Sequence, residues 1–198
     1  MRTTTTLLAL AALTLAGSAA PHALQAQDVS LELRGSLTKA LGDFGDVATS
    51  DAGLGADLIV QASPNLSIYG GYGRDMFGRE GGDDDDNYNS QGFEAGAKLM
   101  AAREGGIIPW LRGGLTLHKL TIEDGGADIE SDRNLGFQIG AGVDIPLGDV
   151  LTFSPGVRYQ NYDAEFDAVV DALDTNAGVS YLTADFGVRI DLAGLRSN

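Results

Sequence analysis

The sequence predicts an all-β protein, an antiparallel up-and-down barrel of eight strands, from three observations. Apolar and polar residues alternate with a period of two in eight segments of about ten residues. The links between these segments are alternately short and long. Glycine, 28 of the 198 residues, gathers on the polar side of the alternation. We expect strands at residues 28–41, 53–63, 66–76, 88–101, 107–120, 133–146, 150–162 and 179–192.

The first residues predict export from the cytoplasm. Arg2 precedes the apolar run Leu7–Ala16, which is too short to span a bilayer as a helix and is followed by small residues. We expect residues 1–26 to be a signal peptide, with cleavage after Ala26 preferred to cleavage after Ala20, and residues 27–198 to form one barrel domain. A buried N-terminal helix is the alternative interpretation.

The composition argues against a nucleic-acid-binding protein and against a membrane protein that spans with helices. The chain has 13 basic and 28 acidic residues and a net charge of −15, which argues against nucleic acid as a partner because phosphate binding needs clustered Lys and Arg. After residue 26 no run of about 20 apolar residues remains, so the sequence offers no transmembrane helix. Cysteine is absent, and stability must therefore come from a packed core or a closed hydrogen-bond network rather than from disulfides.

Glycine indicates which face of the barrel lies inside. A soluble, lipocalin-like barrel would bury the apolar face and expose the polar one. Glycine weakens a strand, and on a watery outer face its clustering would have no purpose. Inside an eight-stranded barrel it makes room for long side chains, so we expect the polar face to line the lumen and the apolar face to meet lipid. The predicted lumen charge network, in which acids and bases can pair, consists of Glu32, Arg34, Glu94, Lys98, Arg112, Arg158 and Arg189.

The lengths of the links indicate which end of the barrel faces the outside of the cell. Short turns at one rim and long loops at the other are typical of outer-membrane barrels, whose long loops face the outside of the cell. The expected long loops are residues 42–53, 74–89, 119–133 and 161–178, and they carry an acidic excess. Within the last, Asp163 and the spacing of apolar residues over Ala164–Leu173 predict a short helix, with an irregular loop as the alternative.

An acidic cluster in the second long loop, Asp83, Asp84, Asp85 and Asp86, is a weak candidate for Ca²⁺ or Mg²⁺. It lacks the spacing of an EF-hand, so a solvated acidic loop is the favoured interpretation. We expect no cofactor, and divalent cations only as partners of the acidic loops.

The segment Asp185–Leu192 reads polar-x-Gly-x-x-apolar-x-apolar. It resembles the signal in the last strand of bacterial outer-membrane barrels that the barrel-assembly machinery recognises. In this chain the signal would consist of Asp185, Gly187, Ile190 and Leu192. The whole mature chain resembles the outer membrane protein β-barrel family, the small OmpA/OmpX-type barrels, although Leu192 stands where many members end on an aromatic residue. The resemblance implies a monomer in the outer membrane of a Gram-negative bacterium, with outer-membrane lipid, lipopolysaccharide and the assembly machinery as partners.

The function predicted is non-enzymatic: a membrane-structural role, or a surface interaction through the acidic loops. A narrow pore or conduit for small solutes or apolar ligands is the alternative, and a lipid A-modifying enzyme is the least favoured. Such chemistry needs a histidine with a serine and a carboxylate. His118, the only histidine after the signal peptide, has no serine in its own segment, although another strand could supply one.

Five aromatic side chains fit either an aromatic girdle at the bilayer boundary or packing in the lumen. They are Tyr69, Tyr72, Trp110, Tyr159 and Tyr181.

Overall fold

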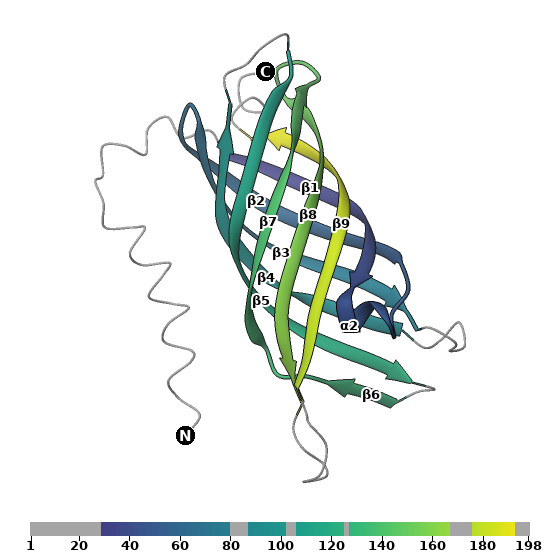
Figure 1. The fold of residues 1–198 in the computed structure, drawn as a ribbon. Helices are drawn as coiled ribbons and strands as arrows, with labels where there is room; N and C mark the ends of the chain where they lie inside the picture. Colours follow the sequence, from purple (N-terminus) through teal and green to yellow (C-terminus); the bar gives the residue numbers. More distant parts are fainter. Residues whose placement is uncertain (1–28, 80–86, 102–105, 125–126, 167–175, 193–198) are drawn as a thin grey trace, which may run out of the picture.

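The computed structural model describes residues 29–79, 87–101, 106–124, 127–166 and 176–192, and in them eight antiparallel strands close into a barrel (Figure 1). Each strand pairs with its neighbours in sequence, and the pairing of the first strand with the last closes the ring. The eight strands are β1 (Val29–Leu41), β2 (Asp51–Ser63), β3 (Leu66–Gly78), β4 (Asn87–Met100), β5 (Ile108–Asp124), β7 (Asn134–Pro146), β8 (Leu151–Glu165) and β9 (Asn176–Asp191).

Two smaller elements lie at the long-loop rim. The strand β6 (Ala127–Glu130) pairs with the outer end of β5, and the one-turn helix α2 (Gly42–Gly45) follows β1. Figure 1 shows α2 and β6 at the same end of the barrel. The described residues contain no helix long and apolar enough to cross a membrane.

The predicted eight-stranded barrel is confirmed, but the strands run further outward than the sequence pattern indicated. β5 continues to Asp124, β8 to Glu165, and β9 already begins at Asn176. Hydrophobic alternation ends where the bilayer would end, whereas a ladder of backbone hydrogen bonds continues as long as a neighbouring strand is present. The four expected long loops are therefore partly strand, and β6 lies inside one of them.

The predicted helix over Ala164–Leu173 is wrong in its first turn. Asp163, Ala164 and Glu165 are in β8 and pair with Gly178, Ala177 and Asn176. Residues 167–173 of that prediction lie outside the described residues, as does the predicted signal peptide. Ala164 is fully buried in the apolar cluster at this rim, which favours the extended conformation over a helical turn.

Burial along the strands is the reverse of that in a water-soluble barrel. On β1, Leu33 and Leu37 are 50% and 60% exposed, whereas Glu32 and Arg34 are buried. The same alternation runs through the other strands, so the outside of the barrel is apolar and the inside is polar. Such a surface is stable against lipid and unfavourable in water.

Glycines on the inner face provide the space that the large lumen side chains occupy. A Cβ atom at Gly142 or Gly156 would lie 2.4 or 2.6 Å from the ring of Trp110, and one at Gly55 would lie 2.7 Å from the Arg34 guanidinium. By contrast, Gly35 on the outer face has no atom within 4 Å of that position. The expected reason for the inward glycines therefore agrees with the packing.

An apolar cluster, here called the outer core, fills the barrel at its long-loop end. Phe44 of α2 packs edge-on against Phe77 at 5.1 Å between ring centroids, and Phe77 packs against Tyr181 at 5.0 Å. The remaining buried members of the outer core are Ala40, Ala48, Leu120, Tyr162, Ala164 and Val179. The loop between β1 and β2 thus contributes a side chain that covers the lumen from outside.

Candidate functional site

The middle of the lumen contains a cluster of paired charges. Arg34 of β1 donates from Nη1 to Asp57 Oδ2 and from Nη2 to Glu94 Oε1, which joins β1 to β2 and to β4 across the barrel. Arg112 of β5 lies 3.3 Å from the same oxygen of Asp57 and 3.7 Å from Glu94 Oε2. The guanidinium of Arg112 also stacks over the Tyr69 ring at 4.0 Å. Two cations therefore share two carboxylates, all of them buried.

Arg158 of β8 extends this cluster toward β9. Its Nε and Nη2 donate to the two oxygens of Asp185 at 2.9 and 3.2 Å, and its Nη1 lies 3.4 Å from Glu94 Oε2. Gln138 of β7 donates to the same Glu94 oxygen at 2.6 Å. Glu94 thus accepts hydrogen bonds from β1, β7 and β8 and lies within ion-pair distance of Arg112 on β5, so removing it would leave several buried donors without a partner.

A second group of charges lies nearer the short-turn end. Lys98 donates to Asp144 Oδ1 at 2.9 Å, with Glu32 at 3.9 Å, and its ammonium group lies over the Trp110 ring at 4.5 Å. Arg189 donates to the other oxygen of Asp144 at 2.7 Å. Of the charged residues in this group, Arg189 is the most exposed, with 16% of its side chain accessible.

All seven residues of the predicted lumen network face the interior, and the structure brings each into reach of an opposite charge. The prediction missed four acids that complete it: Asp57, Asp75, Asp144 and Asp185. Their signal was present in the sequence, because each lies on the same alternating face as the inward glycines. The prediction considered only long side chains as lumen groups, yet in so narrow a barrel the short carboxylates are equally close to the arginines.

A hydrogen-bonded cluster connects the outer core to the charged network, because Tyr162 and Tyr181 belong to the outer core and Asp75 lies 3.9 Å from Arg158. Ser90 Oγ is 3.2 Å from His118 Nδ1 and accepts a hydrogen bond from Tyr162 at 2.9 Å. Tyr181 lies 3.2 Å from the same hydroxyl and donates to Asp75 Oδ2 at 3.0 Å. The serine that the His118 segment lacks is thus supplied by β4. All five residues are 0–2% exposed, so the Ser90–His118 pair faces neither lipid nor solvent.

The predicted assembly signal divides between the two faces of β9. Asp185 and Gly187 face the lumen, where a Cβ atom on Gly187 would lie 3.2 Å from Glu32. Ile190 follows Val188 on the lipid-facing side. Leu192 lies just after the strand, where its backbone N–H donates to Val29 at 2.9 Å. Recognition by the assembly machinery stays a prediction.

The five aromatic residues also divide. Tyr69, Trp110 and Tyr181 are buried in the lumen. Tyr72 is exposed on the outer face against Phe93, and Tyr159 lies beside the outward-facing Phe137. The metal candidates Asp83–Asp86 lie outside the described residues. Within the described ranges no three side chains of the metal-binding types converge.

An apolar exterior around a charged interior defines a β-barrel membrane protein. The family model for the outer membrane protein beta-barrel domain matches residues 8–188, and the chain belongs to that family. No curated protein sequence matches the chain.

Solved structures share the fold at low sequence identity. Neisserial surface protein A superposes with a TM-score of 0.63 and 16% identity over 85% of this chain and 100% of that chain. The N-terminal barrel domain of Pseudomonas aeruginosa OprF superposes with a TM-score of 0.52 and 12% identity, over 84% of this chain and 100% of that domain. AlkL, an outer membrane protein whose structure was solved in lipid bilayers, superposes with a TM-score of 0.54 and 14% identity, over 84% of this chain and 91% of that chain. At these identities the likeness concerns the fold alone.

Proposed function

We propose that this protein is a closed, non-enzymatic barrel of the outer membrane that displays an acidic rim to the cell exterior. The observation that carries the proposal is the filling of the lumen. The buried ion pairs around Glu94 occupy its middle, and the outer core covers them. An ion entering the barrel would have to separate several buried pairs, each of which is costly to break.

The apolar exterior supports a role within the bilayer. Exposed leucine, isoleucine and phenylalanine side chains cover the strands, among them Leu54, Ile68, Phe93, Leu115 and Ile139. Burying this surface in lipid releases the water that would otherwise cover it. The barrel is thereby held in the membrane as a rigid unit with satisfied backbone groups.

The long-loop rim supports a role at the surface. Exposed acids there include Asp43, Asp46, Asp51, Asp132 and Asp163. Two of the cations at this rim, Lys119 and Arg74, are already paired with Glu130 and Glu123. A rim of this charge favours cationic partners, or divalent cations that bridge it to the phosphates of lipopolysaccharide.

Planar-bilayer conductance of the refolded protein tests the closed lumen against the conduit alternative. We expect no steady single-channel steps under conditions where an open porin, as positive control, conducts. The variant Phe44→Ala removes the cover supplied by α2 while leaving the ion pairs, and we expect it to stay silent as well. Steady steps from the unaltered protein would refute the closed barrel and favour the conduit.

The enzymatic alternative requires a reactive group within reach of a lipid. Ser90 and His118 lie inside the barrel beneath the outer core. We therefore expect lipid A from cells with and without this protein to have the same mass spectrum. A mass change that disappears in Ser90→Ala would overturn the non-enzymatic proposal.

A further inference from the structure

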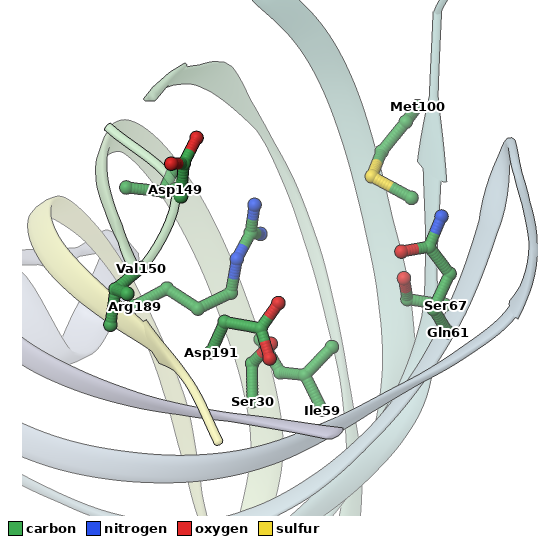
Figure 2. A pocket seen from close by; sticks show the side chains of 10 residues that line it. Ser30, Ile59, Gln61, Ser67, Met100, Asp149, Val150, Arg189 and Asp191 are labelled. Carbon is green, nitrogen blue, oxygen red and sulfur yellow. The ribbon is translucent and has the colours of Figure 1, made fainter. Parts of the chain in front are cut away.

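A cup opens into the lumen at the short-turn end of the barrel. It has a volume of about 110 Å³ and is partly enclosed by side chains from six strands, β1 to β4, β8 and β9, and from the turn between β7 and β8 (Figure 2). The lining is mixed: Arg189, Asp149 and Asp191 are charged, Gln61, Ser30 and Ser67 are polar, and Ile59 and Met100 are apolar. We propose that this cup binds a small zwitterion that carries a carboxylate and an ammonium group on neighbouring atoms, of the size of a small amino acid.

Arg189 is the group that would hold the carboxylate. Figure 2 shows its guanidinium extending into the space between Asp149 on one side and Gln61 on the other. The side chain is fixed from below, because Nη1 donates to Asp144, which is itself held by Lys98 and Ser154. A guanidinium that is positioned before binding loses little side-chain entropy when it pairs with a carboxylate.

The charge of the cup selects against simple ions. Arg189 and Asp149 both line the cup, so a free anion would pair with Arg189 but would also meet the carboxylate of Asp149. A simple cation would be attracted by Asp149 but repelled by Arg189. A zwitterion meets both signs at once, with its carboxylate on Arg189 and its ammonium group toward Asp149 and the hydroxyl and amide oxygens of the wall.

The size of the cup agrees with such a ligand. A cavity of roughly 150 Å³ accommodates benzene, so about half a dozen non-hydrogen atoms fit a space of this order. A neighbouring recess of about 350 Å³ shares Gln61, Met100 and Arg189 and continues past Pro64 and Ile108. Its lining is mainly apolar, and it would receive the side chain of the ligand.

Chemical-shift mapping by NMR, with the refolded barrel in micelles, tests the proposal with three probes. Alanine has both charges, propionate lacks the ammonium group, and ethylamine lacks the carboxylate. We expect alanine to shift the amide signals of Ser30, Gln61 and Ser67 saturably, and the other two probes to bind at least about tenfold more weakly. The absence of a saturable shift with alanine would overturn the proposal, as would propionate or ethylamine binding as well as alanine.

Variants assign the two ends of the ligand. Arg189→Gln and Asp149→Asn should each weaken alanine binding by about tenfold. Arg74→Gln, at the opposite rim, should leave it unchanged. If Arg189→Gln does not refold, Asp149→Asn still decides the matter, because Asp149 is exposed on a turn. Alanine binding that is unchanged in Asp149→Asn would refute the assignment of the ammonium end. The test is independent of conductance, so a conducting barrel would leave the binding proposal standing.

Discussion

Arg158 and Asp185 form a two-point ion pair across the β8–β9 boundary, with both arginine–carboxylate contacts inside the barrel. The arginine side chain is 3% and the aspartate side chain 5% exposed. Because both charges have lost their water, each depends on the other for solvation. The pair also explains why a carboxylate belongs on the inward face of the last strand, independently of any role in assembly.

We therefore expect Asp185→Ala to destabilise the barrel. It leaves the Arg158 guanidinium buried without its two-point partner, which costs about 3–5 kcal/mol of unfolding free energy. Glu94, already in contact with Arg158, should keep the loss toward the lower end. Denaturant titration of the protein refolded in lipid vesicles measures it. The control is Asp163→Asn on the exposed part of β8, which should change stability by no more than about 0.5 kcal/mol. Equal effects of the two changes would contradict this account.

The inward glycines predict a contrast between two alanine substitutions. Gly142→Ala places a methyl group against Trp110 and the backbone of Pro155, and we expect it to destabilise by about 1–3 kcal/mol. Gly35→Ala adds the same methyl group to open space on the lipid side, and should be neutral or stabilise by up to about 1 kcal/mol. Unfolding of both variants in the same vesicles tests the contrast. A loss at Gly35 as large as at Gly142 would show that strand conformation, and not lumen volume, determines the choice of glycine.

Two equally exposed leucines distinguish a bilayer from water as the surroundings. Leu115, midway along β5, is 58% exposed, and Leu147, in the turn after β7, is 61% exposed. Leu115→Arg should cost about 2–4 kcal/mol, as a charge near the bilayer centre does, whereas Leu147→Arg should cost about 0–1 kcal/mol. Denaturant titration in vesicles measures both. If neither substitution changed stability, the apolar face would not lie in lipid.

The predicted assembly signal should act in cells and not in the refolded protein. Leu192 lies beyond the last ladder pair and contributes a backbone hydrogen bond that any residue except proline can make. We expect Leu192→Asn to lower the yield of folded barrel in the outer membrane, read from its heat-dependent gel mobility, while stability after refolding in vesicles is unchanged. Leu192→Phe, which supplies the aromatic residue usual in the family, should not lower the yield. A normal yield of Leu192→Asn would exclude Leu192 from the signal.

The sequence was sufficient for the strands and for the direction in which they face, because both follow from a period of two and from where glycine falls on it. It was insufficient at the outer rim. There β6 and the outward extensions of β5 and β8 are held by neighbouring strands, so their own hydrophobic pattern carries little information.

The lumen was predicted in its composition but not in its contacts. Ser90 and His118 lie 28 residues apart in the sequence, and only the β4–β5 register brings them together. The position of Trp110, by contrast, was predictable. Residues two apart on a strand share a face, so Trp110 belongs in the lumen with Arg112.

The pairing of β1 with β9 places the two ends of the described chain side by side, with Ser30 opposite Asp191. One edge of β1 therefore has no partner until the last strand has been synthesised and delivered. Such a chain cannot complete its ladder progressively as it emerges, and the entropy of closing the longest loop falls on a single late step. Until then, both terminal strands expose open edges that invite pairing with other chains. To avoid such pairing, the unfolded chain must have the open edges of β1 and β9 covered until these two strands pair with each other.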